Sequence, residues 1–222
     1  MFIRPKYWKV GFTCFVLLWT YAIWDDYNTR TRRVGERKIC TQAIGVYDVD
    51  SPDQKASAEL NDLIRSFKDN SEVSVIFSNG QGKELHSPIG DVYIKDFKFQ
   101  GYSSWIEYTK GCRFSYIVIN KNYPQEYRST FLHEFGHQVF DRLSDIQKHQ
   151  YADLRGIPYS NLESLDSSTD RLKYGSNGSE DFAEVYRYVN DKSRIPFTVY
   201  GVPNNQITDF VDGVVTIYGD SR

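Results

Sequence analysis

Residues 129–142 read STFLHEFGHQVFDR, with the pattern His-Glu-x-x-His running from His133 to His137. Apolar residues recur three or four positions apart here, which is the spacing of one face of an α-helix. Proline at the first helical position has no amide hydrogen to leave unpaired, so the sequence predicts a helix from Pro124 to about Gln150. Its predicted apolar stripe comprises Leu132, Phe135, Val139, Leu143 and Ile146. We expect this helix to lie at the centre of the fold.

His133 and His137 are four residues apart, so on a helix their imidazoles point to nearly the same place. Two nitrogen donors aimed at one point suit a tetrahedral zinc ion. Glu134 lies about 100° further around the helix, where it can reach a water on the metal but not easily the metal itself. Gly136 is expected to leave the helix surface open beside the ion, at some cost in helix propensity. The alternative is an ordinary solvated polar face without a metal.

The third ligand of such a site is expected to be a carboxylate. A catalytic zinc ion usually takes three protein ligands and keeps one position for water. Of the other histidines, His149 lies too far along the same helix, and His86 lies in a polar turn. Two stretches offer carboxylates: NLESLD with Glu163, and SEDFAEVYRY with Glu180 and Glu184. Ligands need rigid support, which favours the helical pair, but helical geometry permits either glutamate of that pair.

The rest of the chain predicts one α+β domain. Of its 222 residues 40% are hydrophobic and 16% aromatic, enough for a buried core. The net charge of -2 gives no general attraction to nucleic acid, and no nucleic-acid-binding motif is present. Short strands are predicted at 73–77, 91–99, 105–108 and 114–119, and helices at 51–70, 180–189 and 202–215, with a long loop at 155–179. Strands first and helices later indicate an α+β fold with a small mixed sheet and two site-bearing helices.

The N-terminus has the pattern of a targeting segment. Arg4, Lys6 and Lys9 precede the uncharged apolar run Val10–Trp24, as in a signal sequence. Aromatic residues within 7–24 suit a membrane interface, and no small-residue cleavage pattern follows. Residues 1–24 are therefore predicted to be either a signal peptide or a retained membrane anchor.

We expect residues 25–39 to form a linker and residues 40–222 to form the folded domain, outside the cytoplasm, either secreted or membrane-anchored. Basic residues within the linker count against this orientation under the positive-inside rule. Cys40 and Cys112 form an even pair that could bridge in an oxidising compartment, or remain two buried thiols.

HEFGH, a polar loop containing Tyr174, and then EDFAEVY together resemble the catalytic domain of anthrax lethal factor. They are similar also to the secreted proline-proline endopeptidases of clostridia. The resemblance extends over residues 40–222, and its specific part is 133–137 and 174–186. It implies that Glu180 is the third zinc ligand, that Glu184 supports a ligand histidine, and that Tyr174 faces the substrate carbonyl. Tyr174 stands one residue closer to Glu180 than the family pattern has it.

The predicted function is therefore that of a zinc-dependent endopeptidase with one Zn²⁺ per chain. Glu134 would act as general base, and Tyr174 would help to stabilise the oxyanion. Residues 114–119 would offer a strand edge on which an extended peptide substrate lies. The first alternative is a zinc-holding but catalytically inactive toxin-like or binding domain at the membrane. The second is a purely structural anchored domain that holds no metal.

Overall fold

The computed structural model describes residues 38–39, 46–49, 58, 73–87, 90–107, 112–162, 177–196 and 198–219. They all belong to one compact unit, Lys38–Arg222. The predicted targeting segment, the linker up to residue 37, almost all of the predicted helix 51–70, Tyr174 and Glu163 lie outside the described residues. So does Cys40, and only the backbone of Cys112 is described, so the disulfide stays a prediction.

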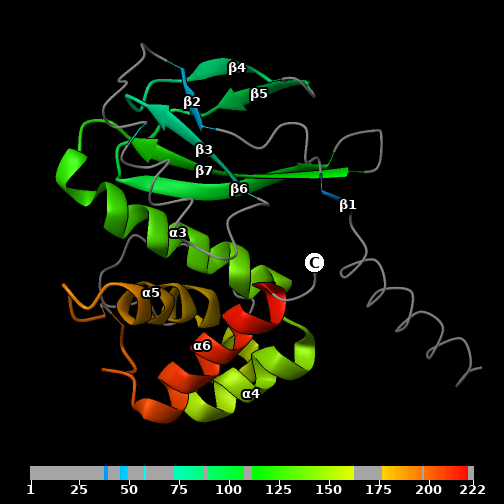
Figure 1. The fold of residues 1–222 in the computed structure, drawn as a ribbon, viewed down its shortest axis with the longest axis vertical. Helices are drawn as coiled ribbons and strands as arrows, with labels where there is room; N and C mark the ends of the chain where they lie inside the picture. The colour runs from blue at the N-terminus through cyan, green and yellow to red at the C-terminus, as the bar shows by residue number, and fades with distance from the viewer. Residues whose placement is uncertain are drawn as a thin grey trace, which may run out of the picture. The chain divides into compact units, whose positions relative to one another are not determined.

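A mixed sheet forms one layer of the unit (Figure 1). Its strands are β1 (Lys38–Ile39), β2 (Val46–Asp48), β3 (Val73–Ser78), β6 (Gly101–Glu107) and β7 (Cys112–Asn120). β1 and β3 run parallel to β7, β6 runs antiparallel to it, and β2 pairs with β3. β4 (Lys83–Ser87) and β5 (Gly90–Ile94) form a separate antiparallel pair. The predicted small mixed sheet is confirmed, and β1 begins two residues before the expected start of the domain.

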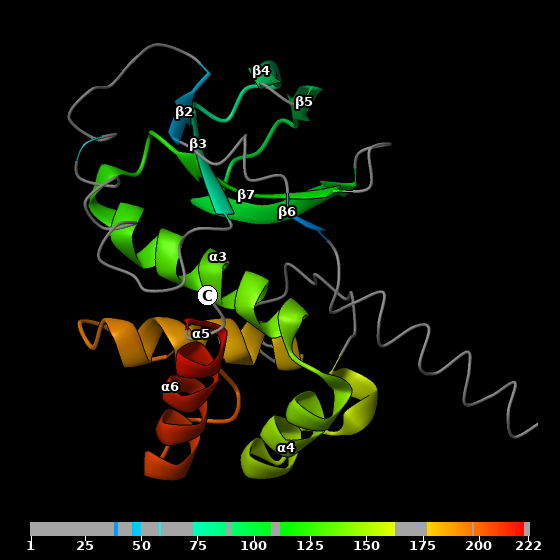
Figure 2. The same ribbon diagram turned by 45° about the vertical axis from the view of Figure 1, so that its right-hand side comes forward.

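Four α-helices are present among the described residues, on the face of the sheet away from β4 and β5 (Figures 1 and 2). They are α3 (Tyr127–Arg142), α4 (Asp145–Arg155), α5 (Gly178–Asn190) and α6 (Asn205–Gly219). Two 3-10 turns, η3 (Pro124–Glu126) and η4 (Tyr159–Asn161), accompany them. α3 packs on β6 and β7, α5 packs on α3, and α6 contacts both α4 and α5. The α+β class is thereby confirmed.

In the described part of the chain, no helix combines the length and the apolar character that crossing a membrane requires.

The predicted helix over 124–150 is interrupted. Leu143 has an extended backbone (ψ 140°) and ends α3. Ser144 then starts α4: its hydroxyl accepts from the Gln147 amide, and the Gln147 side chain accepts from the Ser144 amide. This reciprocal capping stabilises a new helix start, so the helix axis changes direction. The apolar stripe consequently ends at Leu143, and Ile146, expected in the core, is 73% exposed.

β7 lies at the centre of the sheet and contributes to both faces. Ile117 and Ile119 pack toward the helices, whereas Phe114, Tyr116 and Val118 pack with the residues of β4 and β5. This alternation follows from the two-residue period of a strand. Because β7 pairs with β3 on one side and β6 on the other, the prediction that 114–119 form an edge was wrong. Among the described strands, the edge nearest the helices is β6, which pairs only with β7.

Candidate metal centre

α3 and α5 approach each other closely where Gly136 meets Ala183. A Cβ on Gly136 would lie 2.7 Å from the Ala183 Cα and 3.1 Å from the Tyr186 Cβ. Only glycine permits this approach, because any side chain would have to displace the neighbouring backbone. The expectation that Gly136 opens the surface beside an ion was therefore wrong, since this position faces α5. The close crossing brings the first turns of α5 up to the histidines of α3.

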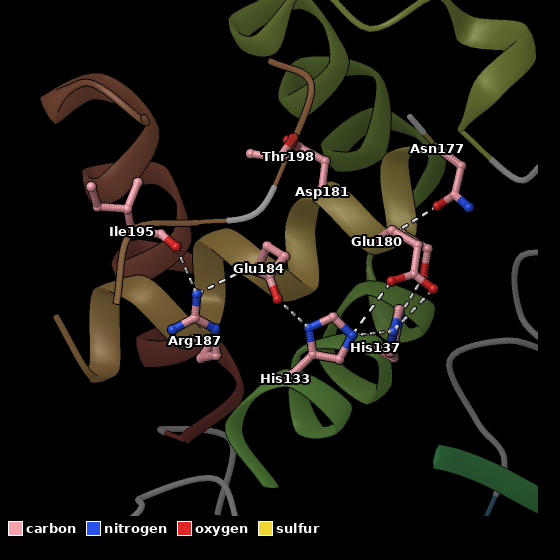
Figure 3. Close-up of polar contacts among 10 residues, drawn as sticks. His133, His137, Asn177, Glu180, Asp181, Glu184, Arg187, Ile195 and Thr198 are labelled. Atoms are coloured by element: carbon pink, nitrogen blue, oxygen red, sulfur yellow. Dashed lines mark hydrogen bonds and ion pairs between the residues drawn. The ribbon is translucent and has the colours of Figure 1, made fainter. Parts of the chain in front are cut away.

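His133, His137 and Glu180 converge on one point (Figure 3). The two Nε2 atoms lie 3.2 Å apart. Glu180 Oε2 is 3.4 Å from His133 Nε2, and Glu180 Oε1 is 3.6 Å from His137 Nε2. His133 is buried, and the other two side chains are half-buried. The helical spacing of the motif and the helix crossing together assemble a group that can hold a metal ion.

The distances within this group fit a small tetrahedral cation. Bonds of about 2.0–2.2 Å at tetrahedral angles place two donor atoms about 3.3–3.6 Å apart. The 3.2 Å between the two Nε2 atoms and the 3.4 Å from His133 Nε2 to Glu180 Oε2 lie close to that range. The 3.6 Å contact with His137 is made by the other oxygen of Glu180, and one ligand atom from each residue lies within 4.8 Å of the other two. Two imidazole nitrogens and a carboxylate leave one tetrahedral position open to the surroundings. The donor set therefore fits a metal that must also bind a further ligand.

The remaining ring nitrogen of His133 is held by a charged group. His133 Nδ1 lies 2.8 Å from Glu184 Oε1. The other oxygen of Glu184 accepts from Arg187 Nη2 at 2.9 Å. All three side chains are buried. A carboxylate acceptor favours the tautomer with hydrogen on Nδ1, which leaves the Nε2 lone pair directed at the site.

The remaining ring nitrogen of His137 is held by a neutral group. His137 Nδ1 lies 2.8 Å from the hydroxyl oxygen of Ser179. Ser179 stands in the first turn of α5, and the Asn177 side chain caps that turn by accepting from the Glu180 amide at 2.7 Å. The cap fixes the start of the helix that supplies both Ser179 and Glu180. Asn177, which lies within the loop predicted over 155–179, thus has a structural role.

The two histidines have opposite proton affinities. Burial by itself would lower the pKa of His133, but the hydrogen bonds that its ring donates to Glu180 and Glu184 override burial and raise the pKa to about 10. Burial and the neighbouring charge of His133 lower the pKa of His137 to about 4. Two lone pairs that face each other at 3.2 Å need one cation between them. Either a proton or a metal ion can supply that charge.

Glu134 stands beside the group and faces the sheet. Its carboxylate accepts hydrogen bonds from the side chain and backbone of Ser103 on β6. Burial raises the pKa of Glu134 to about 7, with Glu180 adding to the rise and His133 and Ser103 opposing it. A carboxyl group with a pKa near neutrality can both accept and release a proton under physiological conditions.

A second buried charge pair fixes α5 on its far side. Arg155 of α4 donates to Asp181 from Nε at 2.7 Å and from Nη2 at 2.6 Å. Tyr151 donates to the same carboxylate at 2.6 Å, and the Thr198 hydroxyl donates to it as well. Asp181 has no exposed surface. This network therefore ties α5 to α4 and to the segment that follows α5, on the side away from the histidines.

The predicted residues His133, Glu134, His137, Glu180 and Glu184 come together in one place, whereas Tyr174 and Glu163 lie outside the described residues. Sequence reasoning missed three partners: Ser179, Arg187 and Ser103. Ser179 precedes Glu180, and Arg187 lies three residues after Glu184, so helical spacing offered a weak signal for these two. Nothing in the sequence pointed to Ser103, which reaches Glu134 only through the packing of α3 on the sheet.

Comparisons of the chain with protein-family models, curated proteins and solved structures found no match.

Proposed function

We propose that this chain is a zinc-dependent endopeptidase of the lethal-factor-like type. The observation that carries the proposal is the triangle of His133, His137 and Glu180, whose ligand atoms all lie within 4.8 Å of one another, with the two Nε2 atoms 3.2 Å apart. Glu134 lies beside that triangle with a pKa of about 7. A metal group with an adjacent general base is the machinery for hydrolysis by an activated water.

Zinc is the metal that this donor set favours. Two histidines and a carboxylate with one open position are the ligand pattern of catalytic zinc, whereas Ca²⁺ and Mg²⁺ prefer oxygen ligands alone. A bound Zn²⁺ would supply Lewis acidity, lowering the pKa of a water toward about 7 and polarising the scissile carbonyl. His133, His137 and Glu180 would hold it. Glu184 and Ser179 would keep the two imidazoles turned toward it.

Glu134 would transfer the protons of the reaction. Its carboxylate accepts a proton as water oxygen attacks the carbonyl carbon of the scissile peptide bond. It then delivers that proton to the nitrogen of the leaving amine as the carbon–nitrogen bond breaks. We assign to Tyr174 the stabilisation of the negative charge that develops on the carbonyl oxygen.

The edge of β6 is a suitable place for an extended peptide. The Asn120 amide donates to the Gln100 carbonyl, so these two residues form a hydrogen-bonded pair, and such pairs recur at every second residue along β6 and β7. The residues between these pairs, Gly101, Ser103 and Trp105, therefore direct their backbone amide and carbonyl groups away from β7. No described strand pairs with that side of β6. The Ser103 amide already donates to Glu134, so a substrate that adds to this edge would pair with the backbone of Gly101 and Trp105 and run past Glu134.

The test is cleavage of a mixed peptide library by the purified full-length chain. We expect hydrolysis that a chelator abolishes and Zn²⁺ restores. Because the ion would join α3 to α5, chelation should also lower the melting temperature. Cleavage that persists after complete removal of metal would contradict the proposal.

Replacing Glu134 by glutamine separates an enzyme from an inactive zinc-holding domain. Glutamine keeps the size of the side chain but cannot accept the proton. We therefore expect zinc content and folding to be retained and turnover to fall by about 10²–10⁴-fold or more. A zinc-loaded Glu134→Gln chain with wild-type turnover would exclude this mechanism. Zinc binding without turnover in the wild-type chain would favour the binding domain.

A further inference from the structure

Arg187 lies behind the metal centre, with 4% of its surface exposed. Its Nη2 donates to Glu184 Oε2 at 2.9 Å and to the Ile195 carbonyl at 3.3 Å. Glu184 Oε1 is 2.8 Å from His133 Nδ1. The two oxygens of Glu184 thus have separate partners, one in the guanidinium and one in the imidazole. A continuous chain of contacts runs from the loop after α5, through Arg187 and Glu184, to His133 (Figure 3).

The orientation of the Glu184 carboxylate determines whether His133 is held. The χ3 angle of a glutamate, which rotates the carboxylate plane, has a broad distribution of allowed values, so packing alone does not fix the orientation of that plane. A guanidinium donates in a fixed plane and fixes the group that accepts from it. Because Arg187 stands one helical turn beyond Glu184, it approaches from the side opposite His133. With Oε2 fixed by Arg187, Oε1 is directed at Nδ1.

We propose that Arg187 is a positioning residue of the metal centre, acting on His133 through Glu184. This rests on the metal site of the proposed function and on no assumption about peptide cleavage. The guanidinium holds the carboxylate, the carboxylate holds the imidazole with hydrogen on Nδ1, and Nε2 faces the ion as a lone pair. The Ile195 carbonyl anchors the far end of the chain of contacts, since it accepts from the same nitrogen of Arg187.

Arg155, on α4, provides a comparison at a second carboxylate of α5. It too joins a carboxylate of α5 to a carbonyl of the following loop: its Nη2 lies 2.6 Å from Asp181 Oδ1 and 3.0 Å from the Gly201 oxygen. Both arginines are buried and pair with a carboxylate. The difference that matters for the metal is what else each carboxylate contacts: Glu184 contacts a histidine of the site, and Asp181 contacts Tyr151. A loss of metal affinity that occurs when either arginine is replaced reflects a less stable fold. A loss that occurs only when Arg187 is replaced reflects its effect on the position of His133.

The experiment is a titration of the metal-free full-length chain with Co²⁺, which reports ligand geometry through its visible absorption. We expect Arg187→Met to weaken Co²⁺ binding by about 10-fold or more and to change the absorption of the saturated complex. Arg187→Lys should recover most of the affinity, because lysine keeps a cation near Glu184. Arg155→Met should lower the melting temperature but leave the absorption at saturation as in the wild type.

A double-mutant cycle shows whether Arg187 acts through Glu184. In a Glu184→Gln background, adding Arg187→Met should cost little further Co²⁺ affinity, because the group it orients has already been changed. Equal losses in both backgrounds, or a wild-type spectrum and affinity in Arg187→Met, would overturn the proposal. Should Arg187→Met fail to fold, Arg187→Gln, which keeps a polar side chain but not the charged guanidinium, takes its place in the cycle with the same criteria. Absence of peptidase activity alongside normal Co²⁺ binding would refute the proposed function only.

Discussion

His133 and His137 face the same carboxylate from one helix, yet the groups behind them differ in kind. Behind His133 stand a buried carboxylate and a buried guanidinium. Behind His137 stands a single hydroxyl in the first turn of α5. Hydrogen bonds to an ionised group are roughly twice as strong as neutral ones. The contrast teaches that two histidines with equivalent places in a motif can be held in position by interactions of unequal strength.

The same contrast appears in the proton affinities of the two rings. Their pKa values move in opposite directions, to about 10 for His133 and to about 4 for His137. His133 is buried and His137 is half-buried, and the loss of solvent favours the neutral form in each. The carboxylates of Glu180 and Glu184 hydrogen-bond to His133 and outweigh burial there. His137 is left with the neighbouring positive charge. The environment, not the residue type, thus assigns the proton.

Glu180→Ala should have the largest effect, because it removes the carboxylate that both histidines face. We expect it to lose nearly all zinc affinity in a competition titration with a chromogenic chelator. Glu163→Ala is the matched control and should bind zinc like the wild type. If Glu163→Ala is instead the weakest binder, the third ligand lies in the segment 163–176, and the resemblance on which Glu180 was assigned has misled.

Glu184→Ala should have the second largest effect and should act on His133 but not on His137. It removes the acceptor of His133 but no donor atom of the metal triangle. Losses of this kind cost about 10–100-fold in metal affinity, so its dissociation constant should lie between those of the wild type and Glu180→Ala. A greater loss for Glu184→Ala than for Glu180→Ala in the same titration would reverse the two assignments.

Gly136→Ala should affect both histidines equally. The added methyl group would meet the Ala183 backbone at 2.7 Å, so α3 and α5 must separate. Overpacking of this kind costs about 1–3 kcal/mol, which calorimetry should detect as a lower melting temperature together with weaker zinc binding. Gly213→Ala in α6 is the control, since a Cβ there meets nothing within 4 Å. Equal stabilities of the two variants would argue against the close crossing.

Residues that act through helical spacing could be predicted from the sequence. His133 and His137 are one turn apart, and Glu180 and Glu184 are one turn apart, so each pair shares a face before any tertiary structure is known. The break after Leu143 was also readable, because Ser144 and Gln147 have the spacing of a capping box. It was missed because apolar periodicity continued across it as far as Ile146.

Contacts that depend on tertiary packing could not be predicted. The pairing of β7 on both sides follows from the order of strands in the sheet, which no local pattern specifies. The contact of Glu134 with Ser103 requires α3 to lie against β6. Gly136 was read as an open surface because the sequence does not show that Ala183 lies opposite. Each of these three contacts involves a partner distant in the chain. The four predicted strands and the helices predicted at 180–189 and 202–215 were found, whereas β1, β2 and β4 were not predicted.

Ser179→Ala should have the smallest effect and gives the sharpest measure of the contrast. It removes the hydroxyl at 2.8 Å from His137 Nδ1 and leaves the carboxylate and guanidinium behind His133 in place. A neutral hydrogen bond contributes about 0.5–1.5 kcal/mol, so zinc affinity should fall by about 2- to 10-fold. The Asn177 cap of the same turn is retained, so the start of α5 should not shift.

The comparison of Ser179→Ala with Glu184→Ala decides whether the two histidines are held unequally. Both variants end in alanine, both remove one acceptor of an Nδ1, and both residues lie on α5, so the same chelator titration applies to each. The smaller loss in Ser179→Ala would reflect a water molecule that can replace a hydroxyl at the half-buried His137, whereas the buried Nδ1 of His133 has no such substitute. If Ser179→Ala loses as much affinity as Glu184→Ala, the charge behind His133 has no energetic consequence for metal binding, and the two sides of the site are equivalent.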